Sequence, residues 1–203
     1  MIVVTAPTGN IGRRVMDELL AAGASLRLVL RDATKLSDTV RSRVEVVEGS
    51  HGDAAVVDLA FAGADAVFWL VPADPAAKSV MEAYVGFSGP AANALRRHAV
   101  QRVVSVTALG RGTPWEKDAG YVTGSLAMDD LLSGTGAAFR AVTNPSFMDN
   151  IARQAVPIRE KGLFFGPISG DRKMPSCAAR DIAAVSARLM LDEGVVAAPM
   201  DLD

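Results

Sequence analysis

The sequence has few of the residues on which disulfide, metal and membrane chemistry depend. Its single cysteine, Cys177, cannot form an internal disulfide, so a reducing, cytoplasmic compartment is expected. Its two histidines, His51 and His98, have no cysteine cluster beside them, and we predict no metal site. No apolar run approaches the roughly 20 residues of a membrane helix, and no cleavable leader is visible.

A strong excess of one charge is also missing. The formal net charge is −2, which gives no electrostatic reason to expect nucleic acid or an anionic membrane as a partner. Internal repeats and low-complexity segments are absent. The chain has 203 residues, of which 50% are hydrophobic, and this is enough to bury one sizeable core. We therefore expect one domain over residues 1–203.

The most informative stretch stands at the N-terminus, where a strand, a turn and a helix follow one another. Ile2–Thr5 is apolar or β-branched, small residues follow, and Ile11, Val15 and Leu19 then recur at helical spacing. At the start of such a helix, unpaired backbone N–H groups and the helix dipole point at one spot. The pattern predicts an anion site; the alternative is an ordinary tight strand-to-helix turn.

Two glycines of this turn suit a dinucleotide. Gly9 would let the backbone close on a pyrophosphate, and Gly12 would let the helix pack closely on the strand. A further glycine is expected where this chain has Ala6, and Pro7 biases Ala6 away from the α region. Alanine can serve at this position only if the turn needs no positive φ there.

The end of the second predicted strand, Leu26–Leu30, bears on the choice of cofactor. An acidic residue there binds the ribose 2′-hydroxyl of NAD, whereas an arginine suits the 2′-phosphate of NADP. The chain has Arg31, with Lys35 close by, and these two cations favour NADP(H) over NAD(H). Asp32 is contrary evidence unless its side chain caps the following turn.

Four further short apolar runs predict strands, at residues 44–47, 65–72, 102–107 and 139–142. Predicted helices lie between and after them, over 54–63 behind an Asp53 cap, from just after Ser88 to about His98, and at about 123–132 and 181–191. The alternation predicts an α/β fold with a doubly wound, mostly parallel sheet and helices on both faces. We expect Pro72 to Pro90 to form an irregular loop with a short helical piece, His51 to be exposed, and 195–203 to form a short strand.

The run Val4–Arg13 resembles the opening of NmrA-like proteins, a branch of atypical short-chain dehydrogenases whose usual opening is T-G-A-T-G-x-x-G. Further similar runs follow in the family's order over nearly the whole chain: Leu30–Asp32, Val46–Gly49, Val67–Pro72, Val103–Gly110, Asn144–Asn150 and Asp181–Ala183. The resemblance implies an NAD(P)-binding Rossmann fold and an oxidoreductase. It also implies that Arg31 binds the 2′-phosphate.

Together with the residue-level reasoning, the resemblance implies a cofactor site built from the ends of several strands. The cofactor-binding candidates are Thr5, Pro7, Thr8, Gly9, Asn10, Ile11, Gly12, Arg31, Lys35, Ser50, Leu70, Val71, Pro72, Thr107, Ala108 and Pro145. Two residues depart from the family pattern. Ser50 replaces an aspartate that lies near the adenine, and Asn144 stands where the family usually has arginine.

The standard catalytic pair of short-chain dehydrogenases is missing. Those enzymes carry Tyr-x-x-x-Lys, in which the ammonium lowers the tyrosine pKa, but here Tyr121 is followed by Ser125 at the lysine position. The catalytic residues stay unknown, and the candidates are Tyr121, Ser105 and Thr107. NmrA-like reductases commonly lack the pair too. Hydride transfer to a quinone or flavin acceptor needs mainly proximity to the nicotinamide.

An acceptor pocket is expected around Trp115, Phe147 and Met148, with a small excursion over residues 144–180 contributing to it. Core packing explains Phe147 and Met148 equally well, and for Trp115 a role as an anchor of its loop is favoured over a role as a stacking wall for the acceptor. Family members usually continue for many tens of residues. The pocket is therefore expected to be open or completed by a second subunit of a homodimer, unless the chain is a fragment or a degenerate paralogue.

These observations support three functional hypotheses. The first is an NADPH-dependent oxidoreductase that passes hydride to a small, aromatic or quinone-like acceptor. The second is a non-catalytic NADP(H)-binding redox sensor that acts through a protein partner. The third is a structural or interaction module that has kept the fold and lost the nucleotide.

Overall fold

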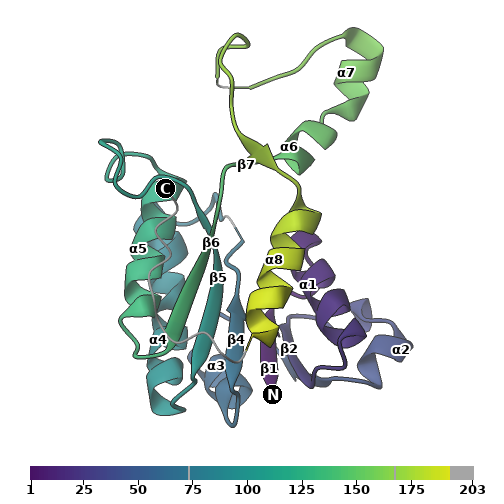
Figure 1. Cartoon of the computed structure of the whole chain (residues 1–203), viewed down its shortest axis with the longest axis vertical. Coiled ribbons are helices and arrows are strands. Elements are labelled where there is room, and N and C mark those ends of the chain that lie inside the picture. The colour runs from purple at the N-terminus through teal and green to yellow at the C-terminus, as the bar shows by residue number, and fades with distance from the viewer. Residues whose placement is uncertain (73, 167, 193–203) are drawn as a thin grey trace.

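The computed structural model describes residues 1–72, 74–166 and 168–192. Six parallel strands form one sheet in the order β3-β2-β1-β4-β5-β6 (Figure 1). Their bounds are β1 Ile2–Thr5, β2 Leu26–Leu30, β3 Glu45–Glu48, β4 Ala66–Trp69, β5 Arg102–Ala108 and β6 Ala138–Asn144. The strand order reverses between β1 and β4, so the expected doubly wound sheet is confirmed.

Helices cover both faces of the sheet. One face carries α1 (Asn10–Ala21) and α8 (Ala179–Leu191), and the other carries α3 (Ala54–Phe61), α4 (Phe87–Arg97) and α5 (Tyr121–Ser133). The alternation of side chains along a strand supplies both cores, since Val3 packs with the second group of helices and Val4 with the first. Short helices η1 (Ala33–Lys35) and α2 (Asp38–Arg41) lie between β2 and β3.

The segment before α4 differs from its prediction. The chain is helical from residue 80, through the π-helical turn η2 (Glu82–Gly86) into α4, so the irregular loop ends ten residues before Pro90. Proline 90 lacks the N–H that an α-helix would direct to the carbonyl of Gly86, and the wider η2 turn lies just before it. Ser88 does not precede the helix. It is buried within it and accepts a hydrogen bond from Trp69 Nε1 at 3.1 Å.

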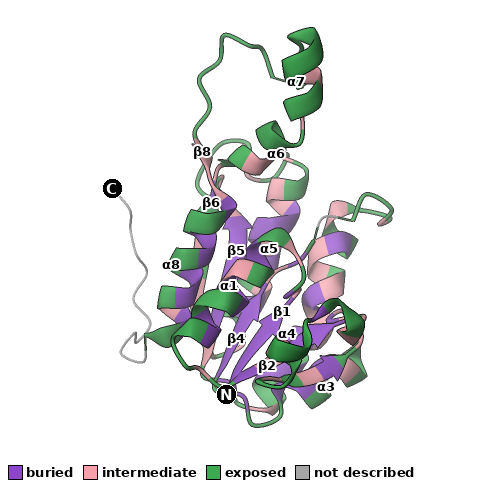
Figure 2. Ribbon diagram, turned by 90° about the vertical axis from the view of Figure 1, so that its right-hand side faces the viewer, coloured by how far each residue is buried: buried purple, intermediate pink, exposed green. Residues whose placement is uncertain are grey.

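An excursion projects from the sheet after β6 (Figures 1 and 2). It contains β7 (Ser146–Phe147), α6 (Met148–Ala152) and α7 (Ala155–Lys161), and it returns through β8 (Ser176–Cys177), which pairs with β7. Figure 2 colours α7 as largely exposed, whereas the central strands are buried. The expected excursion therefore includes a helical segment over residues 155–161.

The predicted final strand, 195–203, lies outside the described residues. In the described part of the chain, no helix has the length and apolar character required to cross a membrane.

Candidate functional site

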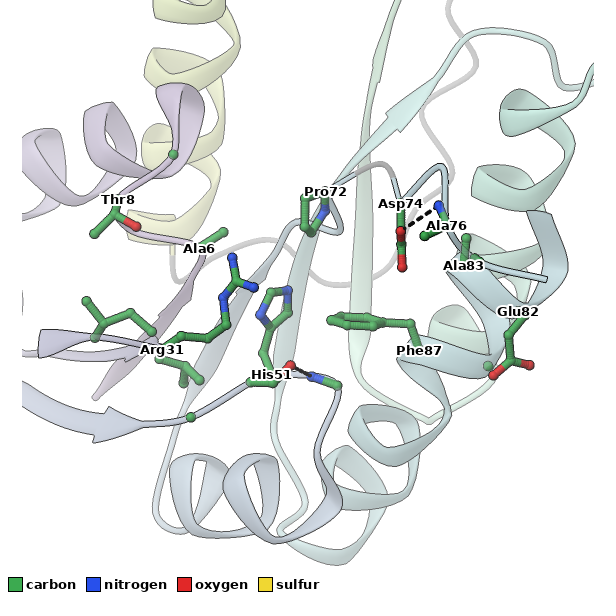
Figure 3. Close-up of a pocket in the computed structure, with 18 of the residues that line it drawn as sticks. Ala6, Thr8, Arg31, His51, Pro72, Asp74, Ala76, Glu82, Ala83 and Phe87 are labelled. Carbon is green, nitrogen blue, oxygen red and sulfur yellow. Dashed lines mark hydrogen bonds between the residues drawn. The ribbon is translucent and has the colours of Figure 1, made fainter. Parts of the chain in front are cut away.

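A cavity of about 960 Å³ opens at the carboxyl end of the sheet (Figure 3). Such a volume is typical of a site for a sizeable small molecule. Its wall comes from the turn after β1, the end of β2, the loop after β3 and the segment that leads into η2. It therefore lies over the strands next to the reversal point, where doubly wound sheets bind nucleotides.

The turn between β1 and α1 is very close-packed. A Cβ atom on Gly12 would lie 2.2 Å from the carbonyl oxygen of Ala6, so the helix rests directly on the turn, as expected of this glycine. Gly9 donates its backbone N–H to the same oxygen at 3.0 Å. Ala6 itself has φ of 50°, in the left-handed region. The condition that the turn needs no positive φ at Ala6 is thus not met, and the alanine is held there at a cost of about 1–2 kcal/mol.

The N-terminus of α1 has backbone N–H groups that are not satisfied within the helix. Gly9 occupies the N-cap position in extended conformation, and no side chain of the described residues caps the helix. Its first N–H groups therefore have no intrahelical acceptor, and the helix dipole adds partial positive charge. Ala6, Thr8 and Gly9 line the cavity beside this end. The geometry suits a phosphate or pyrophosphate.

Other candidates of the same stretch serve the fold. Thr5 is fully buried, and its hydroxyl donates to Phe68 O and accepts from Leu70 N, both at 3.0 Å, which joins the ends of β1 and β4. Ile11 belongs to the core, and Pro7 is buried. Asn10 donates to Asp149 Oδ1 at 2.7 Å and so ties the start of α1 to α6.

The end of β2 separates its two charged residues. Asp32 accepts from the backbone N–H of Thr34 at 3.0 Å and from its hydroxyl at 2.6 Å, which lowers the pKa of this carboxyl. The interpretation of Asp32 as a turn cap is therefore correct. Arg31 is exposed and lines the cavity, where its guanidinium forms no ion pair with the described residues. Lys35 is exposed at the end of η1 and does not line the cavity.

The loop after β3 corrects another prediction. His51 is only 8% exposed, not a solvated loop residue, because its ring packs edge-on against Trp69 and Phe87. Its Nε2 lies 3.1 Å from the carbonyl oxygen of Leu70. Burial lowers the pKa of this histidine to about 4, the Leu70 contact opposes the change, and the charge of Arg31 adds to it. The ring is thus neutral at pH 7.

The other candidates after β3 and β4 have different environments. Ser50 lines the cavity, and its hydroxyl oxygen accepts from Gly52 N at 3.3 Å. Pro72 also lines the cavity, whereas Leu70 is partly buried against the core and Val71 is buried in it.

A second polar cluster is buried between β5 and α5. The hydroxyls of Thr107 and Ser125 lie 2.7 Å apart, and Ser125 stands at the position of the missing lysine. Asp129, one turn further along α5, is 4% exposed, and burial raises its pKa to about 7, against the hydrogen bond from Thr107. Ser105 Oγ and Asp129 Oδ1 are buried without a hydrogen-bond partner among the described residues.

The remaining candidates lie toward the β5 and β6 ends of the sheet. Ala108 ends β5, and Pro145 is partly buried between β6 and β7. Asn144 is buried and donates to Thr107 O at 3.2 Å, so it links these two strand ends. Tyr121, at the start of α5, is 44% exposed, and its ring centroid lies 6.3 Å from that of Tyr84.

The three residues expected at the acceptor pocket have different environments. Trp115 is 73% exposed, Met148 is 48% exposed, and Phe147 packs against the core of α1 and α8. None of them lines the cavity. Two residues of interest, Phe87 and Asp129, were absent from the sequence-based candidates. For Asp129 the available signal was its position four residues after Ser125 on one helix face.

The reversal of strand order, the uncapped helix and the arginine at the end of β2 together define a dinucleotide-binding Rossmann domain. The family model described as "NAD(P)H-binding" matches residues 7–193. The chain therefore belongs to this NAD(P)H-binding family, in agreement with the resemblance found in its motifs.

Individual relatives extend this result. The chain is 28% identical over 194 residues to an NAD(P)H azoreductase of Xenophilus azovorans. It is 32% identical over 196 residues to a (4-alkanoyl-5-oxo-2,5-dihydrofuran-3-yl)methyl phosphate reductase of Streptomyces griseus. Each alignment covers 96% of this chain and 64% of the relative, so the chain spans less than two thirds of their length.

Solved structures agree with the fold. The NADPH complex of the Escherichia coli quinone oxidoreductase QOR2 superposes with a TM-score of 0.80 at 20% identity, covering 96% of this chain and 66% of that one. The NADP(H) complex of the Citrobacter triphenylmethane reductase gives a TM-score of 0.77 at 19% identity, covering 95% and 66%.

Proposed function

We propose that the chain binds NADPH and passes its hydride to a small aromatic or quinone-like acceptor. The observation that carries the proposal is the cavity, in which an uncapped helix N-terminus and Arg31 face the same space. The names of the relatives, an azoreductase and a quinone oxidoreductase among them, support an acceptor of this class.

The preference for NADPH over NADH rests on charge. Arg31 offers a guanidinium to the cavity, and a guanidinium matches the geometry of a phosphate in two parallel hydrogen bonds. The acidic side chain that would favour NAD, Asp32, is engaged by Thr34. At the end of β2, Arg31 is therefore available to bind a 2′-phosphate, whereas the carboxylate of Asp32 is hydrogen-bonded within its own loop.

The residues near the β5 end have a positioning role in this proposal. When bound, NADPH supplies the hydride, and a quinone completes its reduction by taking one proton from water. Thr107 and Ala108 end β5 next to Asn144, and the buried Thr107–Ser125 pair holds this strand end against α5. The fold orients the donor there by packing, and no tyrosine–lysine pair is required.

The test is a titration of the full chain with NADPH and with NADH, followed by tryptophan fluorescence. Trp69 contacts His51 and Phe87 in the cavity wall, so its emission reports ligand there. A Trp115→Phe variant removes the exposed second tryptophan. Quinones and azo dyes are then added, and oxidation of NADPH is measured.

The outcomes separate the hypotheses. Saturable NADPH binding with turnover supports the reductase. Binding without turnover of any acceptor in the panel favours the redox sensor. Binding of neither nucleotide refutes both.

A further inference from the structure

His51 is held rigidly in the cavity wall. Its ring centroid lies 4.8 Å from Phe87 and 5.2 Å from Trp69, with both pairs inclined by 79°. Its Nε2 contacts the backbone oxygen of Leu70 at the end of β4. Three elements therefore orient one imidazole: the loop after β3 carries it, β4 binds it, and α4 packs against it.

The contact with Leu70 decides which ring nitrogen carries the proton. A backbone carbonyl oxygen can only accept, so the 3.1 Å contact requires a hydrogen on Nε2. The ring is neutral because it is buried, and a neutral imidazole has only one N–H. Nδ1 is then a lone-pair acceptor. Within the described residues it has no hydrogen-bond partner, and it is not an enclosed buried atom.

The neighbours of His51 form a surface suited to a flat ring. Figure 3 shows the imidazole between Arg31 and Phe87, with Pro72 beside it. The Phe87 ring lies directly on the Gly52 backbone, since a Cβ there would come within 2.5 Å of Phe87 Cε2. The wall is thus apolar and aromatic on the Phe87 and Pro72 side of His51 and cationic on the Arg31 side, and Nδ1 of His51 adds a directional acceptor to it. A nucleobase needs this combination of surfaces.

We propose that His51 selects the base of the dinucleotide, with Nδ1 accepting a hydrogen bond from the exocyclic amino group of adenine. The inference rests on the proposed binding of NADPH and adds a specificity-determining residue to that site. Arg31 and His51 then divide the recognition, the first reading the 2′-phosphate and the second the base.

This assignment predicts discrimination against hypoxanthine. The dinucleotide with hypoxanthine in place of adenine presents a carbonyl oxygen where adenine has its amino group. Two lone pairs would then face each other, and Nδ1 would lose its donor. We expect the wild-type chain to bind NADPH roughly tenfold more tightly than this analogue, the factor for one hydrogen bond in a partly desolvated site.

The experiment compares the two dinucleotides on three proteins. His51→Phe keeps a ring between Trp69 and Phe87 but removes the acceptor, and we expect it to bind both dinucleotides alike and weakly. His98→Gln is the matched control, because His98 contacts Asp58 and does not line the cavity. It should keep the wild-type preference. Equal binding of both by the wild-type chain, or a preference retained by His51→Phe, would overturn the inference while NADPH binding itself stands.

A second measurement uses the unmodified protein, in case His51→Phe fails to fold. The chain has two histidines, so ring ¹⁵N signals are readily assigned with His98→Gln. We expect an unprotonated Nδ1 at pH 7 in the free protein, and a shift of its signal with NADPH that the hypoxanthine analogue does not reproduce. A proton on Nδ1, or equal shifts with both dinucleotides, would refute the role of His51. Failure of the wild-type chain to bind either dinucleotide would instead refute the proposed function.

Discussion

Asp129 is the buried group whose ionisation should affect stability most. It is 4% exposed, and burial raises its pKa to about 7 from 3.8, the value for a solvated aspartate. Below pH 3.8 the carboxyl is protonated whether the chain is folded or not, so its stabilising contribution is complete. Between about pH 4 and 7 only the unfolded chain ionises, and this contribution is lost as the pH rises through the folded pKa.

The magnitude follows from the size of the shift. A displacement of about 3 pKa units corresponds to about 4 kcal/mol between pH 4 and pH 7, at about 1.4 kcal/mol per unit. His51 acts in the opposite sense. Its pKa falls from 6.5 to about 4, so its contribution is present above pH 6.5 and is lost on acidification, by about 3 kcal/mol. The two effects should largely cancel between pH 4 and 6.5.

Asp129→Asn removes the pH-dependent contribution of Asp129 to stability and leaves that of His51. We expect the stability of the variant to increase steeply from pH 4.5 to 6.5, as His51 alone dictates, whereas the wild-type stability changes little. The free-energy difference between the two proteins should shift by about 2–4 kcal/mol in favour of the variant from pH 4.5 to 7.5. Urea unfolding at several pH values measures this.

The matched control is Asp130→Asn, which removes an exposed carboxyl from the next position of α5. It accounts for the loss of a negative charge from the helix. If the difference between wild type and Asp129→Asn does not change with pH, the burial argument for Asp129 is refuted.

Four further changes test the site. Arg31→Ala should weaken NADPH binding roughly 10- to 100-fold in a titration, with little effect on NADH binding. Equal losses of affinity for both dinucleotides would refute the 2′-phosphate assignment. The control is Arg188→Ala, which removes an exposed arginine from α8. Gly12→Ala should cost about 1–3 kcal/mol and abolish binding, because its Cβ meets backbone; normal NADPH affinity would contradict the close packing. Ala6→Gly should add about 0.5–1 kcal/mol in urea unfolding, and a loss would mean that Ala6 is unstrained. Tyr121→Phe should leave quinone reduction within about twofold, and a fall of roughly a hundredfold would identify Tyr121 as a proton donor.

Much of the fold could be predicted because its signals are local. The β1 and β2 bounds match their predictions, and the caps at Asp32 and Asp53 were readable since each side chain bonds a backbone N–H two or three residues ahead. The continuous helix from residue 80 was missed because Gly86 and Gly89 were interpreted as breaks in the chain, although both lie within the helical segment.

The candidate site was predictable only in part, for the same physical reason. A turn and the strand end next to it are set by neighbours in sequence, so Gly9, Gly12 and Arg31 could be chosen without a structure. The state of a titratable side chain depends on what covers it. His51 is neutral because Trp69 and Phe87 come from β4 and α4 to bury it, and neither lies near it in sequence.

The sequence by itself determined the alternation of strands and helices, the tight turn between β1 and α1 and the cation at the end of β2, because each depends on residues only a few positions apart. Only the tertiary structure decided the positive φ of Ala6 under the packed α1 helix, the burial of Asp129 against β5 and the position of the His51 ring beside the Leu70 carbonyl. Burial, strain and proton affinity arise from contacts between distant segments, and such contacts exist only once the chain has folded.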